Sequence, residues 1–121
     1  MYYIVIPTYN EKENIVRTVK KVRSECAKID EEFSILVADD NSPDGTKQAL
    51  TTFLRNNKKG AKVEIISKDK SGLKDAYFNA FRHLLANKND IAGVIQMDAD
   101  LSHHPKYLRQ HIERLRKGID L

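Results

Sequence analysis

Short runs of apolar residues alternate along the chain with longer segments in which apolar residues recur every three or four positions. The short runs are rich in β-branched residues, as buried strands are; they occupy residues 2–6, 33–38, 63–66 and 94–97. The longer segments have the spacing of amphipathic helices; they cover residues 15–29, 46–56 and 74–86, and another begins at 105. This alternation predicts an α/β fold with a mostly parallel sheet and helices on both faces.

Individual residues predict where these elements begin and end. Pro7 is expected to end the first strand, Asn10 to cap the first helix with Glu13 in capping-box position, and Asp44 to cap the second helix. The strand at residues 94–97 is expected to be buried and central. The third helix is expected to bury one apolar face, made of Ala76, Tyr77, Ala80, Phe81, Leu84 and Leu85.

Size and composition allow one soluble globular domain. The chain has 121 residues, of which 40% are hydrophobic and 31% charged, and a net charge of +4. The basic residues are scattered over helices, so nucleic acid is not indicated, although a phosphate-bearing partner is weakly favoured. Cys26 is the one cysteine, which excludes an internal disulfide and a thiolate cluster. No apolar stretch reaches the roughly 18 residues of a membrane span, and no signal peptide is expected.

Polar loops follow three of the predicted strands, at residues 7–11, 39–44 and 98–100. In a parallel sheet these strand ends share one edge, where α/β folds bind ligands. Asp98 and Asp100 lie two positions apart, so in extended chain they point the same way and can converge on one hard cation. With Lys68 and Lys70 after the third strand, a nucleotide bound through Mg²⁺ or Mn²⁺ suits this set of residues.

Each loop also has an ordinary structural explanation. A lone Asp-x-Asp occurs often by chance as a solvated turn, and Asp39 and Asp40 precede a Pro-Asp-Gly turn that aspartates commonly cap. Glu11 could serve a helix N-terminus through the helix dipole. His103 and His104 are adjacent and therefore unsuited to share a metal ion.

Three motifs carry a resemblance to a known family. VIPTYNEKENI (residues 5–15), VADDNSPDGT (37–46) and MDADLSHHPKYL (97–108) resemble the inverting glycosyltransferases of family 2, and within them the dolichol-phosphate mannosyltransferases. The resemblance covers the whole chain. It implies a GT-A fold, a Rossmann-like nucleotide-diphospho-sugar transferase domain, in which residues 1–121 form a single donor-binding part.

The resemblance implies metal-dependent transfer of mannose from GDP-mannose to a polyprenyl or dolichyl phosphate, in the cytoplasm or at the cytoplasmic face of a membrane. Peripheral membrane association would then rest on parts outside this chain. Catalysis and metal binding fall to Asp98 and Asp100, with Asp100 as the principal ligand. The residues expected to bind the nucleotide sugar are Pro7, Tyr9, Glu11, Val37, Asp39, Asp98, Ala99 and Asp100.

Two departures leave alternatives open. Lys74-Asp75 replaces a Gly-Thr pair usual in the family, and the chain stops three residues into what looks like another strand, so the GT-A domain is expected to be incomplete at its C-terminus. The alternatives are a family 2 transferase with another donor, such as UDP-glucose, and a catalytically incomplete nucleotide-binding module.

Overall fold

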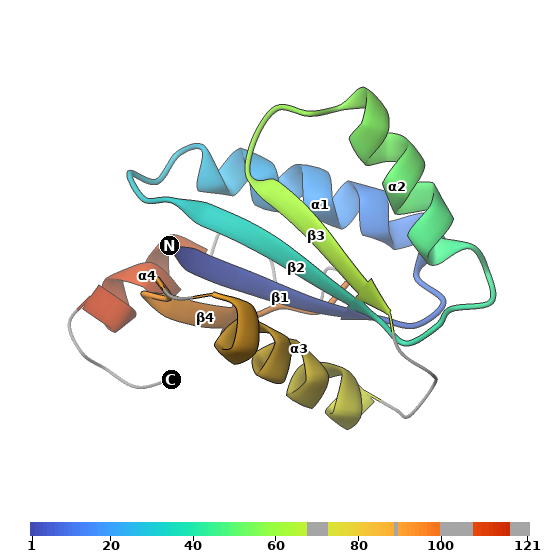
Figure 1. Cartoon of the computed structure of the whole chain (residues 1–121). Helices are drawn as coiled ribbons and strands as arrows, with labels where there is room; N and C mark the ends of the chain where they lie inside the picture. The colour runs from blue at the N-terminus through green and yellow to red at the C-terminus, as the bar shows by residue number, and fades with distance from the viewer. Residues whose placement is uncertain (68–72, 89, 100–107, 117–121) are drawn as a thin grey trace.

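The expected alternation of strands and helices is present in the structure, a computed structural model that describes residues 1–67, 73–88, 90–99 and 108–116 (Figure 1). Its elements, in chain order, are β1 (Tyr2–Thr8), α1 (Lys12–Cys26), β2 (Phe33–Asp39), α2 (Thr46–Asn56), β3 (Lys62–Ser67), α3 (Leu73–Asn87), β4 (Gly93–Gln96) and α4 (Leu108–Arg116). The second helix has the predicted bounds. The helix start expected at Pro105 lies outside the described residues.

The four described strands form one parallel sheet in the order β3-β2-β1-β4. Their register sets Tyr2 of β1 opposite both Phe33 and Gly93. The predicted parallel sheet is confirmed. The prediction that residues 94–97 form a central strand is wrong for the described sheet, because β4 lies at its edge. In this strand Ile95 is buried but Gln96 is exposed.

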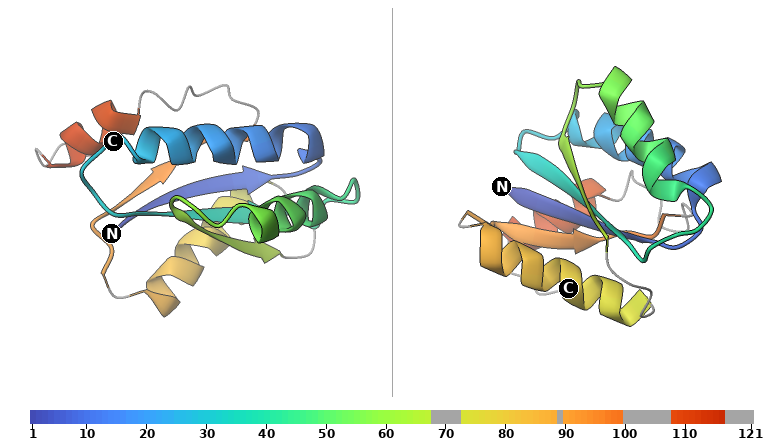
Figure 2. Two further views of the ribbon diagram at one scale, coloured as in Figure 1. Left: turned by 90° about the horizontal axis from the view of Figure 1, so that it is seen from above. Right: turned by 45° about the vertical axis from the view of Figure 1, so that its right-hand side comes forward.

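Side chains alternate between the two faces of the sheet and build a separate hydrophobic cluster on each. Even-numbered residues of β1 and odd-numbered residues of β2 join α1, α2 and α4 in one cluster. The opposite set, with Tyr3, Val5, Leu36 and Ala38, packs against Ala80 and Leu84 of α3. Figure 2 shows α1 and α3 on opposite sides of the sheet, so the prediction of helices on both faces is confirmed.

The predicted end of the first strand at Pro7 is wrong, because β1 continues to Thr8. Alternate residues of a parallel strand bond to opposite neighbours, and the Val5 carbonyl accepts from the Met97 N–H of the β4 side at 3.0 Å. Pro7 therefore faces the same side as Val5. The next bond of a parallel ladder would run from the N–H of residue 7 to the Met97 carbonyl, and proline has no N–H, which agrees with the end of pairing between β1 and β4 at Gln96.

The inward face predicted for the third helix is partly wrong. Ala80 and Leu84 are buried, whereas Leu85 is 78% exposed. Residues 80 and 84 are four apart and share a side of the helix, while residue 85 is turned about 100° further round. Because α3 rests on a sheet face with no second helix packed beside it among the described elements, its buried stripe is narrow. The side chains of Ala76 and Tyr77 lie outside what the structure describes.

The described helices include none that combines the length and apolar character needed to cross a bilayer.

Candidate functional site

Strands β1, β2, β3 and β4 end on the same side of the sheet, at Thr8, Asp39, Ser67 and Gln96, which we call the carboxyl edge. Two of the three predicted loops meet here, residues 9–11 after β1 and residues 40–45 after β2, which we call the rim loops. They are joined by hydrogen bonds in which backbone N–H groups of the first loop region donate to side chains of the second. The pairs are Asn10 N to Ser42 Oγ (2.9 Å), Glu11 N to Thr46 Oγ1 (3.0 Å) and Lys12 N to Asp44 Oδ2 (3.1 Å).

The predicted cap of the first helix at Asn10 is wrong. Asn10 has a φ of 54°, in the left-handed region that asparagine tolerates, and Glu11 is the N-cap residue without a side-chain capping bond. Asp44 takes this role from the other loop, because its carboxylate accepts from the N–H of Lys12, the first residue of α1. A capping bond between segments 32 positions apart could not be found from local sequence.

Asp44 was predicted to cap the second helix, but the N-cap residue is Gly45, without a side-chain capping bond, and the helix is held from one residue earlier by Asp44. Its Oδ1 accepts from the N–H of Thr46 at 2.9 Å and from the Thr46 hydroxyl. Burial by itself would raise the pKa of Asp44. The hydrogen bonds from Thr46 and Lys12 and the Lys12 charge outweigh that effect and lower the pKa. One ionised carboxylate thus holds the first turns of both helices at the carboxyl edge.

Asp39, expected to bind the nucleotide sugar, is 4% exposed and accepts three hydrogen bonds inside the protein. The Thr8 hydroxyl donates to Oδ1 at 2.7 Å, the Ser42 hydroxyl to Oδ1 at 2.6 Å, and the Ser42 N–H to Oδ2 at 3.0 Å. These bonds join the end of β1 to the second rim loop. Asp39 therefore stabilises the conformation of the carboxyl edge. Ligand binding by Asp39 stays a prediction.

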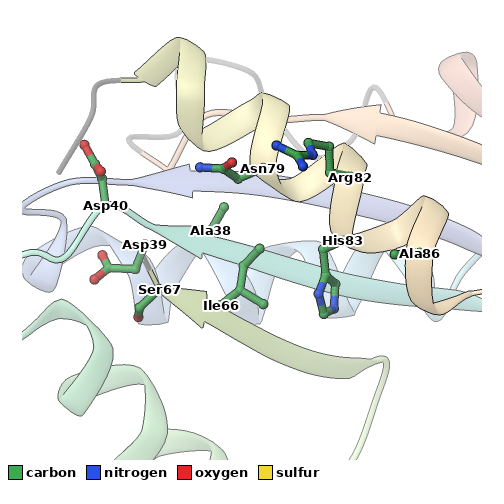
Figure 3. Close-up of a pocket in the computed structure, with 9 residues that line it drawn as sticks. All are labelled: Ala38, Asp39, Asp40, Ile66, Ser67, Asn79, Arg82, His83 and Ala86. Atoms are coloured by element: carbon green, nitrogen blue, oxygen red, sulfur yellow. The ribbon is translucent and has the colours of Figure 1, made fainter. Parts of the chain in front are cut away.

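Asp39 and Asp40 project to opposite sides of the sheet (Figure 3). Asp39 continues the alternation of β2 on the α1 side, and Asp40, 6% exposed, falls on the α3 side with Ala38. Ile95, Met97 and Ala99 belong to the α1 cluster, so the same alternation places Asp98 on the α3 side. The geometry therefore puts Asp98 on the same side of the sheet as Asp40, which was not among the residues predicted to bind the donor.

The third predicted loop reaches the carboxyl edge through Asp98 and Ala99. Asp98 is half-buried, and Ala99 is buried with its carbonyl accepting from the Thr18 hydroxyl of α1 at 2.7 Å. The register of β4 against β1 sets Asp98 level with Pro7. Asp100, Lys68 and Lys70 lie outside the described residues.

The remaining predicted donor-binding residues differ in how accessible they are. Tyr9 is 37% exposed and Glu11 is half-buried, its Oε2 accepting from Asn14. Pro7 and Val37 are buried, and the Val37 side chain lies in the α1 cluster. Any contact of Val37 with a ligand would have to come from its backbone.

A cavity of about 430 Å³ opens beside the carboxyl edge, between α3 and strands β2 and β3 (Figure 3). Its lining comes from the ends of β2 and β3 and from one side of α3, and comprises Ala38, Asp39, Asp40, Ile66, Ser67, Asn79, Arg82, His83 and Ala86. The α3 residues were not predicted as site residues. Their spacing of i, i+3, i+4 and i+7 is a signal that could have found them, since these positions share a helix face.

Divalent cation binding can be tested only in part on the described residues. Among them no group of three or more histidine, cysteine or acidic side chains could hold a metal ion. Asp98 fits the predicted role in kind, since a carboxylate at the carboxyl edge is the hard oxygen ligand that Mg²⁺ and Mn²⁺ take. Its predicted partner Asp100 is outside the described part.

Two curated proteins are similar to the chain in sequence. The chain is 34% identical over 119 residues to the polyprenol monophosphomannose synthase of Mycolicibacterium smegmatis, matching 98% of this chain and 42% of that protein. It is 36% identical over 112 residues to the undecaprenyl-phosphate mannosyltransferase of Micrococcus luteus, matching 93% of this chain and 43% of that protein. The chain thus spans less than half the length of these curated relatives.

Solved structures share the fold. A mannosyltransferase from Pyrobaculum calidifontis in complex with GDP-Man and Mn²⁺ superposes with a TM-score of 0.67 at 25% identity, over 82% of this chain and 27% of that one. S. aureus TarS in complex with UDP-GlcNAc gives a TM-score of 0.67 at 21% identity, over 96% of this chain and 31% of that one. The expected GT-A fold is confirmed. The family model of glycosyl transferase family 2 matches residues 3–121, and the chain therefore belongs to glycosyltransferase family 2.

Proposed function

We propose that this chain is the donor-binding part of a glycosyltransferase that takes mannose from GDP-mannose and transfers it to a polyprenyl or dolichyl phosphate. Membership of family 2 supports sugar transfer. The names of the two curated relatives, which concern polyprenol and undecaprenyl phosphate, support the acceptor class. The structural neighbour with GDP-Man and Mn²⁺ supports the donor and the use of a divalent cation.

The observation that carries this proposal is the arrangement of the carboxyl edge. Two rim loops are fixed to each other by side-chain hydrogen bonds, and Asp40 lines a cavity on the α3 side of the sheet, the side to which the alternation assigns Asp98. A rigid edge lets a nucleotide bind without ordering the loops at that moment, a cost that otherwise weakens affinity. The exposed ring of Tyr9 is suited to contact a ribose or a base.

Asp98 and Asp100 would hold Mg²⁺ or Mn²⁺, which supplies charge neutralisation to a departing nucleoside diphosphate. The chain's own part is to fix the diphosphate at the carboxyl edge, so that the bond from C1 of the sugar to the diphosphate oxygen can break. An acceptor phosphate oxygen attacks C1 from the opposite face, forms the new C–O bond and inverts the anomeric centre. The phosphate monoester is already an anion, so no strong general base is required.

Isothermal titration of the chain with GDP in the presence of Mn²⁺ tests the proposal. We expect binding heat that depends on Mn²⁺, and at least a tenfold loss of affinity in Asp98→Ala and in Asp100→Ala. Asp30→Ala, which removes an exposed carboxylate after α1, is the matched control and should bind as the unaltered chain does. Absence of heat from the folded chain, or equal affinity in all three variants, would contradict the proposal.

A further inference from the structure

Thr18 is a polar residue on the buried side of α1. It lies in the apolar stripe of this helix, between Ile15 and Val22, and is 1% exposed. Threonine is a weaker helix former than alanine or leucine, and a hydroxyl buried among apolar side chains is unfavourable unless it has a hydrogen-bond partner. Helix formation and apolar packing would both favour another residue at this position, so the role of Thr18 follows from its hydrogen bond.

The partner of Thr18 is a backbone carbonyl 81 positions away in the chain. The Thr18 hydroxyl donates to the carbonyl oxygen of Ala99 at 2.7 Å, in a buried position. A threonine hydroxyl inside a helix can instead donate to the carbonyl four residues earlier in the same helix. Because a hydroxyl has one hydrogen, the bond to Ala99 takes the place of that local bond. Thr18 thus connects the middle of α1 to the segment after β4.

The Ala99 carbonyl lies beyond the paired part of β4. Pairing of β4 with β1 ends at Gln96, and the Met97 N–H still donates to the Val5 carbonyl. Ala99, 3% exposed, comes after this ladder, and a buried carbonyl without a donor is unfavourable. The Thr18 hydroxyl supplies a donor from the helix, and it therefore fixes a stretch of backbone that lies past the ladder of the sheet.

This stretch carries the two carboxylates of the proposed metal site. Asp98 precedes Ala99, and Asp100, outside the described residues, follows it in the chain. The Ala99 carbonyl belongs to the peptide unit that joins residues 99 and 100. A peptide unit is planar, so a bond that orients its carbonyl orients the whole unit. The donor from α1 therefore constrains the backbone that joins the two carboxylates.

Helix α1 is a suitable support for this bond, because its start is already fixed to the second rim loop. The Glu11 N–H donates to Thr46 Oγ1, and the Lys12 N–H donates to Asp44 Oδ2. Thr18 follows Lys12 by six residues, about 9 Å along the helix. One helix thus connects the two rim loops to the backbone after β4, the third loop of the carboxyl edge.

We propose that Thr18 is a positioning residue for the divalent cation: through the Ala99 carbonyl, it holds Asp98 and Asp100 in the arrangement that binds the ion together with the donor diphosphate. This inference rests on the proposed function, because the metal site belongs to it. Thr18 acts through the backbone of its partner rather than by contact with the ion. Groups that orient metal ligands in this way typically contribute about 10–100-fold to metal affinity.

Variants of Thr18 test this inference through the affinity for Mn²⁺. Thr18→Val removes the hydroxyl and keeps the β-branched shape, Thr18→Ala removes it with a better helix former, and Thr18→Ser keeps it. Val22→Ala, a substitution in the same buried stripe one turn further along α1, is the control for lost stability. Titration calorimetry at a fixed GDP concentration gives the Mn²⁺ concentration at half saturation, and urea unfolding gives the stability of each variant.

We expect Thr18→Val and Thr18→Ala to raise the half-saturating Mn²⁺ concentration about tenfold, the lower end of the range for groups that orient metal ligands. Thr18→Ser and Val22→Ala should change it less than twofold, although Val22→Ala unfolds at a lower urea concentration.

Two results would overturn this inference and leave the proposed function standing. In the first, the variants without the hydroxyl bind Mn²⁺ within twofold of the unaltered chain. In the second, Val22→Ala or Thr18→Ser weakens Mn²⁺ binding as much as Thr18→Val does, so that the loss does not depend on the hydroxyl. If the folded, unaltered chain binds no GDP in the presence of Mn²⁺, the proposed function itself fails.

Discussion

Replacing Asp39 by alanine is the most direct test of how the carboxyl edge is held together. The Asp39 carboxylate is almost fully buried and accepts from the hydroxyl of Thr8 and from both the hydroxyl and the N–H of Ser42. The substitution removes the acceptor and leaves three donors in place. If Asp39 serves the fold in this way, its loss must lower the free energy of unfolding even when no ligand is present.

The expected loss follows from the number of donors. A buried donor left without its acceptor costs about 1–3 kcal/mol, and the lower end applies where water can reach the donor, as it can at Ser42. Three donors at about 1 kcal/mol each give a loss of about 3 kcal/mol. With a urea m-value of about 1.5 kcal/mol per molar, the unfolding midpoint should fall by roughly 2 M.

Equilibrium unfolding in urea, followed by far-UV circular dichroism, measures this loss. Asp39→Asn is the conservative comparison: its amide oxygen can still accept from a hydroxyl, but it carries no charge and one position becomes a donor, so about half of the loss is expected. A double-mutant cycle of Asp39→Ala with Thr8→Val should give a coupling energy of about 1 kcal/mol, because the 2.7 Å bond joins these two residues.

An unfolding free energy within 0.5 kcal/mol of the unaltered chain would refute this reasoning. So would a coupling energy near zero in the cycle with Thr8→Val. Either result would mean that the hydrogen bonds of Asp39 add nothing to the stability of the fold.

Further predictions concern α3, the cysteine and the shared helix cap. Leu84→Ala should lower the free energy of unfolding by about 2–5 kcal/mol, whereas Leu85→Ala should change it by less than 0.5 kcal/mol in the same urea assay, because Leu84 is 1% and Leu85 78% exposed. Burial, with a smaller contribution from the Glu25 charge, raises the pKa of Cys26 to about 12, so Ellman's reagent at pH 8 should label it only in denaturant; rapid labelling of the folded chain would contradict its burial. The pKa of Asp44 is lower in the folded chain than in the unfolded chain, so the unfolded chain binds more protons as the pH falls below about 4. The contribution of Asp44 to stability should therefore be present above about pH 4 and be lost as the pH falls through the folded pKa. Asp44→Ala should flatten this part of the stability–pH curve.

Much of the architecture follows from local sequence. The period of the apolar residues separates strands from helices, since side chains repeat every two residues in a strand and every 3.6 in a helix. The bounds of α2 and the buried stripe of α1, which includes Ile15, Val19 and Val22, came from this period alone. Strands joined by helices must run parallel, so the gathering of the polar loops at one edge of the sheet could also be predicted.

Other features were decided by contacts between segments far apart in the chain. Asp39 and Asp40 are neighbours with the same side chain, but Asp39 accepts a hydrogen bond from Thr8, which lies 31 positions away, while Asp40 lies toward α3. The strand order, which sets β4 at the edge of the described sheet, also depends on contacts between distant segments and could not be predicted from local sequence. Period and turn residues act within a few positions, whereas partners more than 30 positions apart meet only after the sheet has formed. The sequence by itself thus determined which polar residues follow the strands, and the tertiary structure decided which of them lie together at the carboxyl edge and which bond to other segments of the protein.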